Sequence, residues 1–275
     1  MEIDRRVFLA SVGGLAVVEA MDDEAKAEAL EHYMMDVLDG GHGHEAEGLI
    51  IGGEAQVVAA PPDATIRRGA GSLFGPQGPA ESRKMAELAP MSAKPTLLEF
   101  YEKRFAPANH VLQSATRAMK TGMSEEIILA CLLHDVVLNL VKVDHGWWGA
   151  QMLEPYVPER TSWAIRYHQA LRFYPDSANG YEYPELYTRI FGKDYVPQPH
   201  IKAAYDYARN HKWYLDARMV TVNDLYAFDP NAKVSIEPFQ DIIGRHFKQP
   251  KEGLGNDNSP TAHMWRTMMF PDNPL

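Results

Sequence analysis

The sequence predicts an all-α protein, and three observations support this fold class. Apolar residues recur with helical spacing from about residue 95 onward. The segments that carry this spacing are bounded by helix signals, such as Ser124 before two glutamates, Gly122 after a helical run, and Pro155. No stretch alternates apolar and polar residues for long enough to form a convincing sheet. We therefore expect the helices to pack into a bundle.

Residues 1–21 are similar to a twin-arginine export signal. Arg5 and Arg6 precede a short apolar stretch that ends at Glu19. This stretch is too short to span a bilayer, so no stable membrane anchor is expected. A clear cleavage site of small residues is missing, and an ordinary N-terminal helix is the alternative. The signal predicts a periplasmic protein, whereas the plain helix predicts a cytoplasmic one.

Residues 22–93 are predicted to form a helix followed by an irregular arm. The helix, over residues 22–38, has its apolar side chains on one side. The arm is rich in Gly, Pro and Ala and lacks sustained periodicity. His42 and His44 lie in this arm between glycines. We interpret them as exposed loop histidines rather than metal ligands, because a glycine-flanked pair without carboxylates in a suitable geometry is a weak metal-site pattern.

Residues 94–250 are predicted to form the main helical domain, and residues 251–275 a polar, irregular tail. We expect the last apolar segment of the tail, "HMWRTMMF", to dock on the body or on another subunit, which would make an oligomer. The helices predicted inside the domain cover residues 96–105, 108–122, 124–140, 144–154, 159–174 and, as one or two helices, 200–228.

The composition excludes several classes of function. The formal charge of −10 and the absence of a run of Lys and Arg argue against nucleic-acid binding. The single cysteine, Cys131, excludes an internal disulfide and a thiolate cluster. Any bound metal must therefore use His and carboxylate ligands. Since Cys131 lies among leucines in the middle of a predicted helix, we interpret it as a packed core residue.

A set of His and Asp side chains lies inside or at the start of the apolar helices. A buried carboxylate is costly unless it is paired, hydrogen-bonded or bound to metal. Any single member would most simply be a satisfied core residue. Together they are all of metal-ligand type and are distributed over several helices, which favours a metal site. The set consists of His110, His134, Asp135, His145, His168 and Asp224.

This pattern resembles the H…HD…D signature of the HD-domain superfamily, an all-helical metal-dependent fold. The resemblance covers roughly residues 95–247, and the HD dipeptide is His134-Asp135. His145 and His168 match the six-ligand, dinuclear version of the fold. That version includes phosphohydrolases and the mixed-valent di-iron oxygenases of the myo-inositol oxygenase and aminohydroxyethylphosphonate oxygenase type. The sequence departs from the family pattern after the dipeptide, because members often have Gly-His shortly after it and this chain has Val136-Val137-Leu138-Asn139.

The resemblance implies a dinuclear centre that holds two metal ions. The ions implied are iron, as Fe2+/Fe3+, with Mn, Zn or Ni as alternatives. Asp135 would bridge them and act in catalysis. Asp216 also fits loosely as an alternative to the last ligand. The implied ligands are His110, His134, Asp135 and Asp224 for one ion, and Asp135, His145 and His168 for the other.

Both an oxygenase and a hydrolase would use these ligands. We favour an oxygenase that oxidises a small hydroxylated, anionic substrate with O2, and we keep a phosphohydrolase and a non-catalytic binding protein as alternatives. Arg172 lies one turn after His168 and could hold the anionic group, or it could be a surface arginine. Tyr181 and its neighbouring tyrosines could cover the substrate, or simply pack the loop.

Overall fold

The computed structural model describes residues 26, 29–30, 33–34, 88–105, 108–138, 140–141, 144–191 and 195–271. Within these ranges the chain is helical, with an isolated bridge between Asp176 and Tyr181 and no strand. The prediction of an all-α fold is therefore confirmed. The predicted export signal and the loop histidines His42 and His44 lie outside the described residues.

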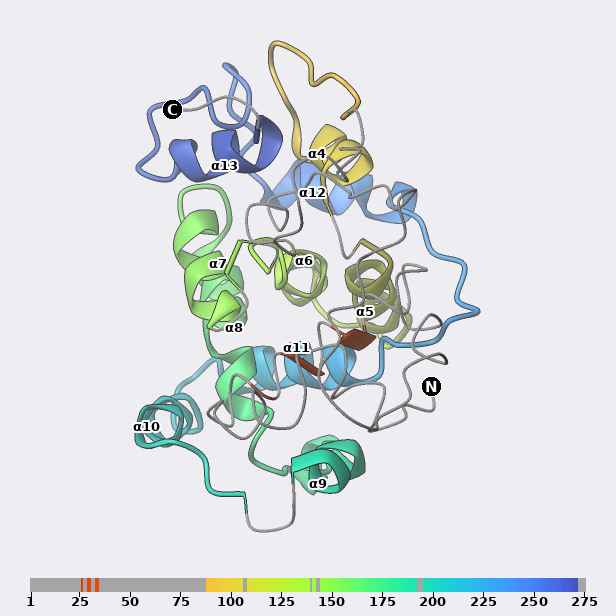
Figure 1. The fold of residues 1–275 in the computed structure, drawn as a ribbon, viewed down its shortest axis with the longest axis vertical. Coiled ribbons are helices and arrows are strands. Elements are labelled where there is room, and N and C mark those ends of the chain that lie inside the picture. The colour runs from red at the N-terminus through yellow and green to blue at the C-terminus, as the bar shows by residue number, and fades with distance from the viewer. Residues whose placement is uncertain are drawn as a thin grey trace, which may run out of the picture.

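The helices form a bundle in which α11 crosses two helix pairs. Figure 1 shows α5 beside α6 and α7 beside α8, with α11 packed against α5, α6 and α8. No helix among the residues described is long and apolar enough to cross a membrane. The bounds are α4 (Leu97–Lys103), α5 (Ala108–Lys120), α6 (Glu125–Leu133), α7 (His145–Leu153), α8 (Glu159–Leu171), α9 (Glu185–Phe191), α10 (Pro199–Ala208), α11 (Tyr214–Leu225), α12 (Gln240–His246) and α13 (Ala262–Met269).

Helix α6 lies at the centre of the core. All side chains from Ile127 to Leu133 are buried, because this helix contacts α5, α8, α11 and α12. Cys131 is completely buried there, and burial raises the pKa of its thiol to about 12. The prediction that Cys131 is a packed core residue is confirmed.

The prediction of one helix over residues 124–140 was wrong at the C-terminal end. Helix α6 ends at Leu133, and the amides of Val136 and Leu138 bond carbonyls only three residues back. His134 Nδ1 lies 2.8 Å from the carbonyl of Cys131, the group that the Asp135 amide would bond in a continued helix. The HD dipeptide therefore lies in a tight buried turn that directly follows α6.

Helix α8 ends in a similar way, three residues earlier than predicted. His168 Nδ1 contacts the carbonyl of Ile165, and the helix ends at Leu171. Arg172 is its C-cap, and the Arg172 amide bonds the carbonyl of Gln169. The predicted helical stretch over 200–228 forms two helices, α10 and α11. The seven-residue helices α9 and α12 were not predicted, because segments this short carry little periodicity.

The C-terminal segment is more ordered than the predicted irregular tail. Helix α13 buries Trp265, Met268 and Met269 in the main hydrophobic core. The Trp265 ring packs edge-on against Phe100 of α4, with 5.3 Å between ring centroids. These contacts join the segment after residue 250 to the same core as the rest of the bundle.

Gly253 allows the segment after residue 250 to approach the backbone at the start of the domain closely. Its φ is +94°, and a Cβ at this position would lie 2.5 Å from the Cα of Lys94. The Gly253→Ala substitution should therefore lower the free energy of unfolding by about 1–3 kcal/mol. Urea denaturation followed by circular dichroism would measure this change.

The matched control is Gly244→Ala in α12, where a Cβ would meet no atom within 4 Å. That substitution should leave the free energy of unfolding unchanged or raise it by up to about 1 kcal/mol, since alanine favours helix. Equal losses in the two variants would contradict the close approach at Gly253.

Candidate metal centre

The six predicted His and Asp side chains converge in one buried cluster. Each has an exposed fraction of at most 3%. They come from separate elements of the bundle, so no local stretch of sequence contains the site. The elements are α5 for His110, the turn after α6 for His134 and Asp135, the first residue of α7 for His145, α8 for His168 and α11 for Asp224.

Asp135 lies at the middle of this cluster. Its Oδ2 is 3.6 Å from Nε2 of His110, whereas its Oδ1 is 3.0 Å from Nε2 of His145. The Oδ1 atom is also 3.4 Å from Nε2 of His134. The two carboxylate oxygens therefore point toward histidines on both sides, as expected for a carboxylate shared between two ions.

The cluster contains three groups whose ligand atoms lie within 4.8 Å of one another. Two of them, which share Asp135, agree with the two ion sites that the resemblance implies. The third joins Asp224 to His134 and His168, so Asp224 reaches both halves of the cluster. The groups are His110, His134 and Asp135; Asp135, His145 and His168; and His134, His168 and Asp224.

The electrostatics of the cluster favour positive charge at its centre. Burial alone would raise the pKa of Asp135, but His134 and His145 outweigh burial and hold that pKa well below its usual range. Burial would also lower the pKa of His134, but Asp135 and Asp224 raise it to about 9. In the apolar core these carboxylates therefore stay ionised and attract a cation.

The donor atoms of the cluster fit a transition-metal centre. Nε2 of His134, Nε2 of His168 and Oδ2 of Asp135 are buried and make no hydrogen bond within the described part of the chain. Buried polar atoms without such a bond are costly, and a bound ion would satisfy them. A set of imidazoles and carboxylates suits Fe, Mn, Zn or Ni.

Asp216 does not join the cluster. It lies in the first turn of α11, where its carboxylate accepts two hydrogen bonds from Arg160, at 2.6 Å from Nε and 2.8 Å from Nη2. This bidentate pair occupies both oxygens. The geometry therefore favours Asp224 over the alternative Asp216.

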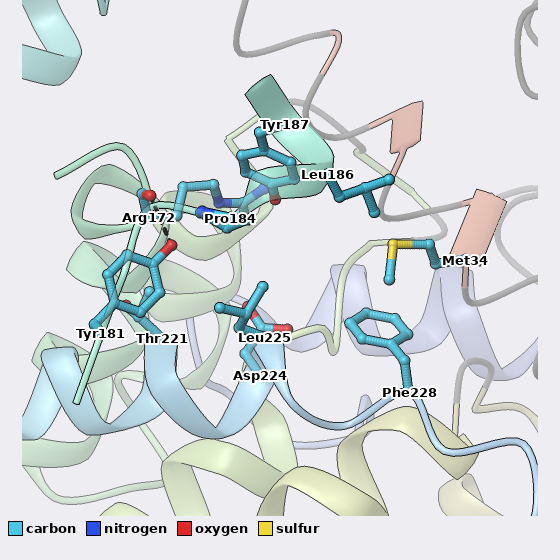
Figure 2. A pocket seen from close by; sticks show the side chains of 10 residues that line it. All are labelled: Met34, Arg172, Tyr181, Pro184, Leu186, Tyr187, Thr221, Asp224, Leu225 and Phe228. Atoms are coloured by element: carbon cyan, nitrogen blue, oxygen red, sulfur yellow. Dashed lines mark hydrogen bonds between the residues drawn. The ribbon is translucent and has the colours of Figure 1, made fainter. Parts of the chain in front are cut away.

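A small pocket opens onto the Asp224 side of the cluster. Its empty volume is about 390 Å³, which includes space open to solvent. Figure 2 shows Tyr181 and Arg172 on one side of it and Met34 with Phe228 on the other, with Asp224 between them. Because a cluster residue and an arginine line one space, a molecule bound there could meet both.

Arg172 and Tyr181 are both parts of this pocket wall. Arg172 is only 3% exposed, so the alternative of a surface arginine was wrong. Tyr181 is 1% exposed, and its hydroxyl donates a hydrogen bond of 2.6 Å to the carbonyl of Arg172 (Figure 2). Tyr181 therefore lines the pocket with its ring while its hydroxyl supports the backbone at Arg172.

Sequence reasoning missed a second buried arginine, Arg218 of α11. Its guanidinium donates to the carbonyls of Leu171 and Tyr174, at 2.9 and 3.0 Å, and lies 4.8 Å from the centroid of the Tyr181 ring. It thus binds the chain on both sides of Arg172. The sequence signal that could have identified Arg218 is its position as a charged residue among the buried residues of α11, between Ala217 and Val220.

The N-terminal segment also contributes to the pocket. The described residues of the predicted helix over 22–38 are helical, and Leu30 is completely buried in a cluster with Phe173 and Tyr187. One turn later, Met34 lines the pocket opposite Tyr181 (Figure 2). No sequence signal identified these apolar residues as part of a site.

Two further residues that were not predicted hold α7 against α8. The Gln169 Oε1 accepts a hydrogen bond of 2.5 Å from the Gly146 amide, and Gln169 Nε2 lies 3.1 Å from His145 Nδ1. A Cβ at Gly146 would lie 2.7 Å from Gln169 Oε1 and 2.8 Å from the carbonyl of Ile165. Only glycine lets the two helices approach closely enough to bring His145 to His168.

No known family model matches this chain. The chain is similar to a glycine-betaine-forming (1-hydroxy-2-(trimethylamino)ethyl)phosphonate dioxygenase of Leisingera caerulea, with 31% identity over 103 residues. The match covers 34% of this chain and 50% of the relative, so the chain spans about half the length of that relative. The relative is an oxygenase named for a hydroxylated phosphonate, and this similarity confirms the resemblance predicted from the His and Asp pattern.

The close approach of α7 and α8 at Gly146 can be tested by substitution. The Gly146→Ala substitution should separate α7 from α8, because the new Cβ would clash with two backbone or side-chain oxygens. We expect metal binding at the His145 side to be lost, so that stoichiometry falls from two ions to one per chain. Elemental analysis after loading with iron without oxygen would measure it.

The matched control is Gly149→Ala on the same helix, where the nearest atoms to a Cβ lie at an ordinary 3.6 Å. That variant should keep both ions. Retention of two ions by Gly146→Ala as well would mean that the α7–α8 spacing does not determine the second site.

Proposed function

We propose that this protein is a di-iron oxygenase that uses O2 to oxidise a small hydroxylated, anionic substrate. One observation carries the proposal: Arg172 and the cluster residue Asp224 line the same small pocket. The similarity to a dioxygenase named for a hydroxylated phosphonate supports both the reaction class and the anionic group.

In this proposal the six clustered residues hold two iron ions. His110, His134 and Asp224 would hold one ion, His145 and His168 would hold the other, and Asp135 would be shared by both. The distances from Asp135 to histidines on both sides support this division. A pair of irons held there would supply the redox chemistry that activates O2.

The chain's own side chains would bind and orient the substrate. A guanidinium offers a planar pair of donors to a phosphonate or carboxylate, and burial strengthens this contact. Since the protein has a net charge of −10, local positive charge is needed to retain an anion. Arg172 would therefore bind the anionic group and leave the hydroxylated carbon facing the Asp224 side of the pocket.

The apolar pocket wall would keep bulk water from the reacting carbon. Met34, Leu186 and Phe228 are among the lining residues and offer no hydrogen bond to water from their side chains. An oxidising site benefits from such exclusion, because side reactions with water are suppressed.

The lining of the pocket disfavours the phosphohydrolase alternative. A hydrolase that acts on a phosphate ester needs several positive groups for the oxygens of the transferred phosphoryl group. Among the lining residues that the structure describes, Arg172 is the one cationic side chain. A single arginine suits an anchor for one terminal anion better.

Iron loading and turnover would test this proposal. Protein loaded with iron without oxygen should bind two ions per chain and show a mixed-valent di-iron signal in EPR or Mössbauer spectra. It should then consume O2 with hydroxylated phosphonates or hydroxy acids. Release of phosphate from phosphate esters without O2 consumption would instead establish the hydrolase.

The Asp135→Ala variant tests the bridge within the same assay. Both ions should be lost, because the shared carboxylate disappears and the two cations repel each other. The control is Asp216→Ala, another buried aspartate, which pairs with Arg160 and should keep both ions. Two ions per chain in Asp135→Ala would mean that this carboxylate does not bridge.

The Arg172→Ala variant tests the anion anchor. It should weaken substrate use by about 1.5–3 kcal/mol while both ions remain, because a charge-assisted bidentate contact is lost. The loss should fall mainly on KM if the contact is equal in the ground and transition states. Arg172→Lys should recover only part of it, since an ammonium lacks the planar pair of donors.

Arg166→Ala provides the control on the same helix, because Arg166 packs over Trp147 and does not line the pocket. Its KM should match that of the unmodified protein. Turnover confined to neutral polyols, or an unchanged KM in Arg172→Ala, would refute the anchor while leaving the metal centre in place.

A further inference from the structure

The last turn of α8 receives hydrogen bonds from side chains of α11. The carbonyls at the C-terminus of a helix have no partner within the helix, so buried ones need donors from elsewhere. Thr221 Oγ1 donates to the carbonyl of His168 at 2.7 Å, and Arg218 Nη1 donates to the carbonyl of Leu171 at 2.9 Å. Helix α11 therefore fixes the end of α8 just before Arg172.

Arg218 also binds the chain beyond Arg172. Its Nη2 donates to the carbonyl of Tyr174 at 3.0 Å, and its Nε donates to the Tyr214 hydroxyl at 3.2 Å. The guanidinium is planar and carries five donor hydrogens, so one side chain can serve all these acceptors at once. The backbone is thus held both before and after Arg172 by the same buried group.

The same guanidinium supports Tyr181 in the pocket wall. It lies 4.8 Å from the centroid of the Tyr181 ring, and its Nε is 3.6 Å from Oδ2 of Asp176. Asp176 and Tyr181 exchange two backbone hydrogen bonds, at 2.7 and 3.1 Å. The Tyr181 hydroxyl in turn donates to the carbonyl of Arg172 (Figure 2). Arg218 therefore also supports the group that binds the Arg172 backbone from the facing wall.

The choice of arginine at position 218 is informative because this side chain is completely buried. Taking a charged group out of water is unfavourable, and an apolar side chain would fill the same space without that cost. An apolar side chain could not, however, donate to the two carbonyls that flank Arg172. The residue type at position 218 therefore suits the task of fixing this backbone better than the task of filling space.

We propose that Arg218 is a positioning residue that fixes the backbone of Arg172, so that the Arg172 guanidinium is already ordered when it meets the anionic group of the substrate. This inference rests on the proposed function, because it takes Arg172 as the anion anchor. An ordered side chain loses less conformational freedom on binding, which strengthens the contact. Arg218 acts without touching the substrate, since it is not among the described residues that line the pocket.

The Arg218→Lys substitution tests this role, because it keeps the positive charge and removes the planar set of donors. The probe is methylphosphonate, titrated calorimetrically into protein loaded with Zn2+, which is diamagnetic and inert to O2. The affinity should fall by about 3–10-fold, the usual contribution of ordering one long side chain. The loss should not exceed that of Arg172→Ala, because Arg218 acts through Arg172.

The matched control is Arg160→Lys. Arg160 also joins α8 to α11, through its bidentate pair with Asp216, but it lies at the start of α8. That variant should bind methylphosphonate as the unmodified protein does. Circular dichroism checks that each variant is folded. If Arg218→Lys does not fold, Tyr214→Phe replaces it, since this change removes the hydroxyl that Arg218 Nε binds and should also lower the affinity.

Nuclear magnetic resonance of Zn2+-loaded protein with 15N-labelled arginine separates positioning from a general loss of structure. The Nε–H signal of Arg172 is assigned by its disappearance in Arg172→Lys. In Arg218→Lys this signal should shift and exchange faster with water, whereas in Arg160→Lys it should not change. An unchanged Arg172 signal in Arg218→Lys would overturn the proposal, because other groups would then position Arg172.

The outcomes also separate this inference from the proposed function. Equal affinity in Arg218→Lys and the unmodified protein, with a clear loss in Arg172→Ala, would overturn the role of Arg218 and leave the anchor standing. An equal loss in Arg160→Lys, or a loss in Arg218→Lys larger than that in Arg172→Ala, would have the same meaning. If the unmodified protein does not bind methylphosphonate, the anchor and the role of Arg218 are overturned together.

Discussion

The burial of two ionised carboxylates in an apolar core is the constraint on which this structure depends. Asp135 and Asp224 lie within the bundle at 2% and 3% exposure, where an isolated charge would be very costly. Four buried histidines surround them. Burial raises the pKa of each carboxyl, but His110 and His134, joined by His145 at Asp135, outweigh burial and hold that pKa below its usual range. The helices α5, α6, α7, α8 and α11 must therefore meet at one place, and this meeting point defines the bundle.

The helix ends show how the chain satisfies this constraint. Helix α6 stops just before His134, whose ring nitrogen contacts a carbonyl that would otherwise continue the helix. The following tight turn places Asp135 between histidines on both sides. Helix α7 begins at His145, and Gly146 lets this first turn lie against α8. Periodicity alone predicted one longer helix over residues 124–140. In the structure the helix ends earlier, so that His134 and Asp135 follow its last turn, and Gly146 allows the start of α7 to contact α8.

The pocket is built from the same helices as the cluster, which couples the pocket wall to the six clustered residues. Arg172 is the C-cap of α8, one turn beyond His168, and Arg218 of α11 binds the carbonyls on either side of it. Asp224 lies on α11 as well, so one pair of helices carries both the proposed anion anchor and a cluster carboxylate.

The sequence by itself determined the all-α class, the burial of α6 and the six residues that meet in the cluster. It could do so because apolar periodicity and buried ligand-type residues are local signals. Only the tertiary structure decided between Asp224 and Asp216, since Arg160, which pairs with Asp216, lies 56 positions away along the chain. It also decided that Arg172 is buried and that Gln169, Arg218 and Met34 serve the site. Such roles arise from contacts between distant helices, and no residue type or spacing within one helix encodes them.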